Sequence, residues 1–178
     1  MKIVILQGSP NLDGSTAMLV DSFTKGASEN GHEVIRFDLD RMNINTCTGC
    51  VACGYEGPCA QNDDYQKIRE TLLASGMVVF ATPLYYFGMS AQLKTAVDRF
   101  CAYSVSMNRA NIRSALLTVA WNTENWTFDA LVSHYNTLVR YCNFKDQGMV
   151  LGYGCGTAGM TGRSKYIKQA YELGKNIK

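Results

Sequence analysis

The stretch MKIVILQGSPNLDGST, residues 1–16, decides how the rest of the chain folds. A short apolar run stops at Gly8, and a loop rich in Gly, Ser and Asn follows. From Thr16 onward, apolar residues recur at helical spacing, which predicts a strand, a polar loop and a helix. The start of a helix exposes unpaired N–H groups and the positive end of the helix dipole, which suits a phosphate. The alternative is a capped helix after a polar loop, since neither a Walker Lys nor a G-x-G-x-x-G pattern is present.

The same alternation of strand and helix continues to the end of the chain. We expect strands near residues 2–7, 34–39, 77–81, 114–120 and 147–151, and helices near 16–29, 63–74, from 90, 127–141 and 164–176. This order predicts an α/β fold with a doubly wound parallel sheet in a single domain, residues 1–178. Ligands of such sheets bind beyond the carboxyl ends of the strands. The loops after the first, third and fourth strands should therefore converge.

Composition restricts the class of protein. The 178 residues, 47% hydrophobic and 18% charged, describe a soluble globular domain. A net charge of +2, with scattered Lys and Arg, predicts no nucleic-acid partner. No apolar run reaches the roughly 20 residues of a membrane helix, so we expect no membrane association. Met1 leads directly into the first strand and the chain has seven cysteines, so we expect no signal peptide and a reducing, cytoplasmic location.

The loop after the third strand is unusually aromatic. Its sequence is PLYYFGMS, residues 83–90, and it should lie at the ligand edge of the sheet. Loops at such edges are normally polar, so three consecutive aromatic residues favour a site that binds a flat ring system. An apolar plug or a subunit interface is the alternative.

Four cysteines lie within one short loop, spaced by two, two and five residues: Cys47, Cys50, Cys53 and Cys59. This spacing is compatible with thiolate ligation of a [4Fe-4S] cluster. Zinc, free thiols or a disulfide remain alternatives. Cys101 and Cys142 lie near the ends of helical patterns and are expected to be small core residues. Cys155 lies between two glycines and is expected to be exposed.

Together these motifs resemble the flavodoxin-like NAD(P)H-dependent FMN reductase family. The matching motifs are GSP and GST within residues 8–16, P-x-Y-Y at 83–86, SA-x-LK-x-x-x-DR at 90–99, and the segment 154–175. The cysteine spacing is similar to that of the iron–sulfur flavoprotein branch. The resemblance spans nearly the whole chain. It implies a flavodoxin-like three-layer fold whose five parallel strands have the order 2-1-3-4-5.

The resemblance also implies FMN as cofactor and assigns its contacts. The phosphate would be held by Ser9, Asn11, Ser15, Thr16 and Ala17, and the isoalloxazine would face Pro83, Leu84, Tyr85 and Tyr86. Trp121, after the fourth strand, would cover the ring or pack as a core or interface aromatic. Tyr85 and Tyr86 are the catalytic candidates, either stabilising charge on the reduced ring or orienting a substrate.

The activity implied is that of an oxidoreductase. NADH or NADPH would pass hydride to FMN, and the reduced flavin would pass electrons to a quinone, flavin, nitro or azo compound. A homodimer or higher homo-oligomer is expected from the same resemblance. One alternative is an electron-transfer flavoprotein, with FMN and with or without a [4Fe-4S] cluster, that has no small-molecule substrate. The net charge of +2 is unlike the acidic surface of flavodoxin-type carriers. The other alternative is a non-catalytic sensor that uses the cysteine loop.

Overall fold

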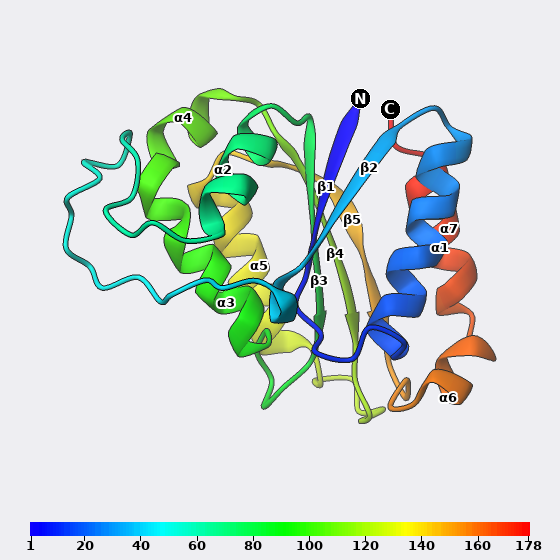
Figure 1. Cartoon of the computed structure of the whole chain (residues 1–178). Coiled ribbons are helices and arrows are strands. Elements are labelled where there is room, and N and C mark those ends of the chain that lie inside the picture. The colour runs from blue at the N-terminus through cyan, green and yellow to red at the C-terminus, as the bar shows by residue number, and fades with distance from the viewer.

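The computed structural model describes residues 1–178 as a five-stranded parallel sheet between two layers of helices (Figure 1). The strands are β1 (Lys2–Gln7), β2 (Glu33–Asp38), β3 (Met77–Pro83), β4 (Arg113–Val119) and β5 (Lys145–Gly152). Their order is β2-β1-β3-β4-β5, and every neighbouring pair is parallel. The predicted flavodoxin-like α/β fold and the order 2-1-3-4-5 are therefore confirmed.

The helices form the two outer layers (Figure 1). One layer contains α1 (Ser15–Glu29), α6 (Ala158–Gly162) and α7 (Tyr166–Lys175). The other contains α2 (Tyr65–Leu73), α3 (Ala91–Asp98), α4 (Ser104–Arg109) and α5 (Asp129–Tyr141), with the 3-10 turns η1 (Leu39–Arg41) and η2 (Arg99–Tyr103). The pattern of apolar residues did not predict α4, α6, η1 or η2, because such short elements contain too few turns to show a period. None of the helices combines the length and the apolar composition that a membrane span needs.

The sheet separates two apolar cores, and successive residues of a strand point into opposite ones. Val4 and Leu6 pack with Phe80 against the layer of α2, α3 and α5, whereas Ile3 and Ile5 pack against α1 and α7. All seven residues of β3 are buried. Central strands that are covered on both faces read as continuous apolar runs, which explains why the sequence identified them.

Helices α1 and α7 approach each other through two glycines. A Cβ atom added to Gly26 would lie 2.1 Å from the carbonyl oxygen of Tyr171, and one added to Gly174 would lie 2.2 Å from that of Phe23. The backbones can touch only because both side chains are absent. This contact fixes α1, whose first turn begins at the carboxyl edge of the sheet.

Two cysteines differ from their expected environments. Cys155 is buried rather than exposed, because its N–H donates to the Ala120 carbonyl at 2.7 Å and turns the residue inward beside β4. Cys101 is exposed rather than part of the core. It lies in the 3-10 turn η2, so it does not follow the 3.6-residue period from which its burial was predicted. Cys142 is buried as predicted.

We expect Gly174→Ala to destabilise the protein by about 1–3 kcal/mol, because the added methyl group must push α1 and α7 apart. Urea denaturation of both proteins measures the difference. Gly159→Ala in α6 is the matched control, since its Cβ would meet only the flexible Arg163 guanidinium at 3.7 Å, and it should not lower stability. Equal stability of Gly174→Ala and the wild type would contradict a tight contact between the helices.

Candidate functional site

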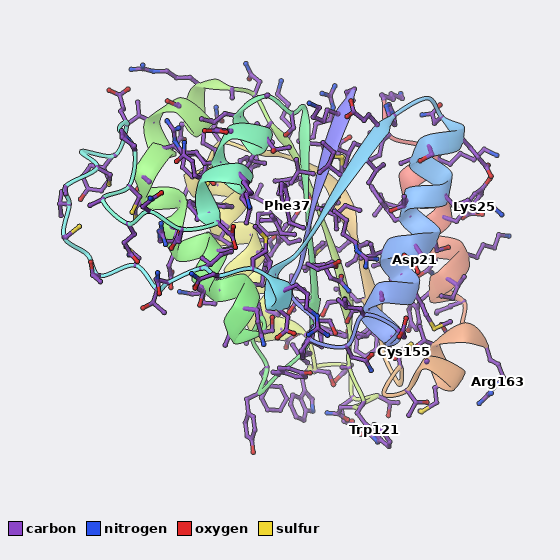
Figure 2. All side chains as sticks on the ribbon, viewed as in Figure 1. Asp21, Lys25, Phe37, Trp121, Cys155 and Arg163 are labelled. Carbon is purple, nitrogen blue, oxygen red and sulfur yellow. The ribbon has the colours of Figure 1, made fainter.

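A cavity of about 250 Å³ lies at the carboxyl edge of the sheet. Three groups of residues line most of it: Ser9, Asn11, Gly14, Ser15 and Thr16; then Pro83, Leu84 and Tyr85; then Val119, Ala120 and Trp121. The loops after β1, β3 and β4 therefore converge as predicted. Cys155 and Gly156, from the loop after β5, also line the cavity and were not predicted to do so. Figure 2 shows Trp121 and Cys155 at this same edge of the molecule.

Hydrogen bonds within the loop before α1 fix its conformation without a ligand. The Ser9 hydroxyl donates to the Asn11 carbonyl at 3.1 Å and accepts from the Asn11 N–H at 3.2 Å. The Asn11 side-chain oxygen accepts from the N–H of Asp13 at 3.1 Å. Gly14 is the N-cap of α1 and provides no capping side chain, and the first turn carries no acidic residue. The amide groups at the start of α1 therefore have no capping side chain and are free to donate to an anion. Ala17, which was predicted to contact the phosphate, is buried in this turn and does not line the cavity.

A set of hydrogen bonds ties the β1 loop to the β3 loop. The Ser90 hydroxyl donates to the Gly8 carbonyl at 2.6 Å, and the N–H of Gly8 donates to the Ala81 carbonyl at 2.8 Å. The N–H of Ser90 donates to the Thr82 hydroxyl at 2.9 Å. A Cβ atom on residue 8 would lie 2.6 Å from the Ser90 hydroxyl oxygen, so only glycine fits. Ser90 was predicted as a helix start, and its role in holding the two halves of the pocket together was missed.

The aromatic loop forms a tight turn. Tyr85 and Gly88 exchange both backbone hydrogen bonds, each 3.1 Å long. Between them, Tyr86 and Phe87 have φ angles of +44° and +64°. Bulky residues rarely adopt this left-handed conformation, which costs roughly 1–2 kcal/mol per residue. Such strain is typical of functional sites. Phe87 lies against Trp126, with ring centroids 5.3 Å apart, and this contact supports the turn.

The turn separates the two catalytic candidates. Tyr85 lines the cavity and is half exposed. Tyr86 does not line it and is fully exposed at the tip of the turn. Tyr85 is therefore placed to contact a ligand within the cavity, whereas the Tyr86 side chain is open to solvent.

Trp121 makes the opposite wall of the cavity. It follows β4, and its indole packs against the glycine-rich turn after β5. A Cβ atom on residue 156 would lie 2.0 Å from Cε3 of Trp121, so Gly156 allows the indole to lie against the backbone. The N–H of Gly154 donates to the Asn122 carbonyl at 3.2 Å and joins the two loops. The G-x-G motif of residues 154–156 was the available sequence signal for this wall.

The residues of the cavity fit FMN. One end offers an uncapped helix N-terminus and hydroxyl groups, which bind phosphate. The other end offers Tyr85, Pro83 and Trp121, which suit a planar ring. FMN has a monophosphate at one end and a flat ring at the other, so the two chemistries of the cavity match those of the cofactor.

A second cavity, of about 150 Å³, is lined by five cysteines: Cys47, Cys50, Cys53, Cys59 and Cys101. The segment that carries the first four runs out from β2 past α3 and α4 (Figure 1). All five are free thiols, and Cys101 was not predicted to belong with the others. Thiols are the right donors for an iron–sulfur cluster. No three of these side chains converge on one point in the structure, so the cysteines as placed do not form a metal site.

The base of this cysteine loop is fixed by a buried ion pair. Arg99 donates to both carboxylate oxygens of Asp63 at 2.7 and 3.1 Å, and both side chains are only 1% exposed. Asn45 joins the pair, because its N–H donates to Asp63 and its carbonyl accepts from Arg99. Burial by itself lowers the pKa of Arg99, but the Asp63 carboxylate and the Cys59 thiol outweigh it and raise that pKa. The guanidinium therefore stays charged in its buried position.

Comparisons with known proteins agree with this geometry. A family model described as "Flavodoxin-like fold" matches residues 1–173, and the chain belongs to this family. An iron–sulfur flavoprotein of Archaeoglobus fulgidus is 36% identical over 103 residues, which cover 58% of this chain and 47% of the relative. The chain thus spans about half the length of the curated relatives it matches.

Solved structures show the same fold at low identity. An NAD(P)H:quinone oxidoreductase from Methanothermobacter marburgensis superposes with a TM-score of 0.78 at 19% identity, covering 99% of this chain and 96% of that one. An FMN-dependent NADH-azoreductase from Bacillus anthracis str. Ames Ancestor, in complex with FMN, superposes with a TM-score of 0.67 at 14% identity. It covers 98% of this chain and 96% of the azoreductase. The resemblance to the flavodoxin-like reductase family is therefore confirmed at the level of family and fold.

We expect Ser15→Ala combined with Thr16→Ala to weaken FMN binding at least tenfold. The change removes two hydroxyl donors to a charged group, and such hydrogen bonds contribute about 1.5–3 kcal/mol each. Fluorescence titration of flavin-free protein measures the affinity. Thr24→Ala, on the same helix but outside the cavity, is the control and should bind FMN as the wild type does. An unchanged affinity of the double variant for FMN would mean that the phosphate binds elsewhere.

Proposed function

We propose that the protein is an NAD(P)H-dependent FMN-containing oxidoreductase. It takes hydride from NADH or NADPH and passes electrons to a small acceptor such as a quinone, flavin, nitro or azo compound. The observation that carries the proposal is one cavity that joins an uncapped helix N-terminus to an aromatic ring site. The names of its fold neighbours, a quinone oxidoreductase and an azoreductase, support the choice of acceptor.

The residues of the first cavity bind and orient the cofactor. The α1 amide groups and the hydroxyls of Ser9, Ser15 and Thr16 donate to the phosphate, and the Asn11 side chain holds their loop in shape. Bound FMN supplies the chemistry of hydride acceptance and electron release. Pro83, Leu84 and the half-exposed Tyr85 form the surface against which the ring packs.

Trp121 and Tyr86 control access to the ring. Trp121 lines one side of the cavity and would shield one side of a bound ring from water. Tyr86 is fully exposed at the tip of the strained turn, next to the cavity-lining Tyr85, and would contact the nicotinamide or the acceptor there. Tyr85 can donate its hydroxyl proton in a hydrogen bond to a ligand oxygen or nitrogen, which would stabilise negative charge there.

The same edge carries apolar surface that a second copy would cover. Tyr86, Phe87, Trp121 and Trp126 are all exposed large aromatic residues from the loops after β3 and β4. Exposed aromatic groups of this kind are enriched at the centres of protein interfaces. We therefore propose a homodimer, with the contact at this edge.

A second candidate function follows from the second cavity. Five thiols gathered around one space favour an electron-transfer flavoprotein that carries a [4Fe-4S] cluster on Cys47, Cys50, Cys53 and Cys59. The Archaeoglobus fulgidus relative is named an iron–sulfur flavoprotein, which supports this cluster. The two functions are compatible, because a cluster can accept electrons from the reduced flavin. They differ in whether a small molecule is the final electron acceptor.

Steady-state oxidation of NADH and NADPH tests the reductase, with a quinone as acceptor and flavin content measured in parallel. The wild type should turn over. Tyr86→Ala should lose about two- to tenfold in kcat/KM for the quinone, because one aromatic contact contributes about 0.5–1.5 kcal/mol. It should keep its FMN, since the phosphate contacts are untouched.

Tyr141→Ala is the matched control, because Tyr141 is also an exposed tyrosine but lies outside the first cavity, at the end of α5. Its turnover should equal that of the wild type. Wild-type protein that is loaded with FMN but inert with both nucleotides across several acceptors would exclude the reductase and leave the electron carrier.

A further inference from the structure

Two of the cysteines around the second cavity meet in space although they are 48 positions apart in the sequence. The Sγ atom of Cys53 lies 3.8 Å from the carbonyl oxygen of Cys101. Cys53 belongs to the long segment between β2 and α2, whereas Cys101 lies in η2. Both residues line the same cavity of about 150 Å³. The fold therefore brings one thiol of the cysteine loop against a cysteine of the helical layer.

The part of the loop around Cys53 lies along η2 and α4 (Figure 1). Three contacts hold it there, joining Cys53 to Cys101, the Tyr55 carbonyl to the N–H of Val105 at 3.3 Å, and Glu56 to Arg109 at 3.4 Å. The three partners on the helical side are each four positions apart, so they lie on one side of that segment. The contact between the two cysteines is thus one of a row rather than an isolated approach.

The backbone beside Cys53 adopts a conformation that its residues disfavour. Val51 has a φ angle of +58° and Tyr55 one of +65°. A β-branched or bulky residue rarely takes up this left-handed conformation. The N–H of Gly54 donates to the Val51 carbonyl at 3.0 Å and closes a turn around Cys53. Strained backbone persists only where the surrounding contacts fix it, so the position of Cys53 is set by its turn and by the contacts with η2 and α4.

The chemistry open to these two thiols is that of a pair. The cysteines as placed do not form a metal site, and all of them are free thiols. Two thiols close together are oxidised to a disulfide by exchange with another disulfide. A sulfur that already lies against the backbone of its partner needs only a small movement of the loop to reach disulfide geometry. Cys101 is exposed and Cys53 is partly buried, so a small molecule in solvent reaches Cys101 first.

We propose that Cys53 and Cys101 form a dithiol site that exchanges with low-molecular-weight disulfides. The Cys101 thiolate attacks one sulfur of a disulfide RSSR, which forms a mixed disulfide at Cys101 and releases the first RSH after protonation. The Cys53 thiolate then attacks the Cys101 sulfur of the mixed disulfide. This step forms the Cys53–Cys101 bond and releases the second RSH. The two cysteines lose two electrons and two protons in total, which convert RSSR to two RSH.

The dithiol site does not depend on the proposed reductase activity. It is an alternative to the cluster proposed above, because a sulfur bound in a disulfide cannot ligate iron. The bond would close a segment of 48 positions and fix the cysteine loop against η2 and α4. Oxidation of the pair should therefore make the loop harder to open.

Peptide mapping of the oxidised protein tests the pairing. Full-length, FMN-loaded protein is purified without oxygen, reduced, freed of reductant and equilibrated with oxidised and reduced glutathione at about pH 8, where thiols begin to ionise. The remaining thiols are blocked with N-ethylmaleimide before digestion with trypsin without reduction. Trypsin leaves residues 42–67 and residues 100–109 as separate peptides. Mass spectrometry should find them joined, and fragmentation should place the bond between Cys53 and Cys101.

Serine variants show which thiols the bond requires. Cys53→Ser and Cys101→Ser should each abolish the joined peptide. Cys59→Ser is the matched control, because Cys59 is likewise partly buried and lines the same cavity. It should form the joined peptide in the same yield as the wild type.

Cleavage of the native protein by chymotrypsin after Tyr55 gives a second readout. Tyr55 is exposed and lies two residues after Cys53. Oxidation should slow this cleavage by about tenfold or more in the wild type and in Cys59→Ser, because a tethered loop opens less often. It should leave the rate unchanged in Cys101→Ser. An equal rate in reduced and oxidised wild type would contradict the tether.

The mapping of the wild type decides the proposal even where a variant does not fold. Cys101 that remains blocked by glutathione as a mixed disulfide would overturn the pair, as would a disulfide confined to residues 42–67 or a bond from Cys101 to Cys47 or Cys50. An iron–sulfur cluster on Cys53 in protein purified without oxygen would also overturn it. None of these results bears on the reductase, which oxidation of NADH and NADPH by the FMN-loaded protein tests separately.

Discussion

The hydrogen bond from the Ser90 hydroxyl to the Gly8 carbonyl is the contact on which the candidate flavin site depends. It joins the loop that would hold the phosphate to the loop that would hold the ring, across 82 positions of sequence. Ser90 also caps α3, where its hydroxyl accepts from the N–H of Leu93. A single buried side chain therefore sets the start of a helix and the distance between the two halves of the pocket. The absence of a side chain at Gly8 is what allows the two loops to come so close.

Helix α3 connects the two cavities. Its N-terminal end begins at Ser90, beside the flavin pocket, and Arg99 follows its last residue at the edge of the cysteine cavity. At 1.5 Å per residue, these two positions are about 14 Å apart along the axis. Both anchors are buried and both are held by hydrogen bonds to loops far away in sequence. A helix fixed at both ends keeps the flavin pocket and the cysteine cavity at a constant separation.

Much of the fold could be predicted from the sequence, because the central strands β1, β3 and β4 are buried on both faces and the long helices show a clear period. The strand, the polar loop and the helix start of residues 1–16 could be predicted as well, since their signals lie within 16 consecutive residues. The features that the sequence did not predict depend on tertiary contacts. The partner of Ser90, the burial of Cys155 and the place of Cys101 beside the other cysteines all depend on segments that meet only after folding. The left-handed turn at Tyr86 and Phe87 contradicts local preference and is maintained by the contact with Trp126. The sequence could not reveal that contact.

The most direct test of the flavin site compares the binding of FMN and riboflavin to flavin-free protein. The two ligands share the isoalloxazine ring and differ by the phosphate. Two or more charge-assisted hydrogen bonds, at about 1.5–3 kcal/mol each, should make FMN bind more than about 100-fold tighter than riboflavin. Titration followed by flavin fluorescence gives both dissociation constants. A strong preference for FMN would agree with a phosphate held at the start of α1, and equal affinities would contradict it.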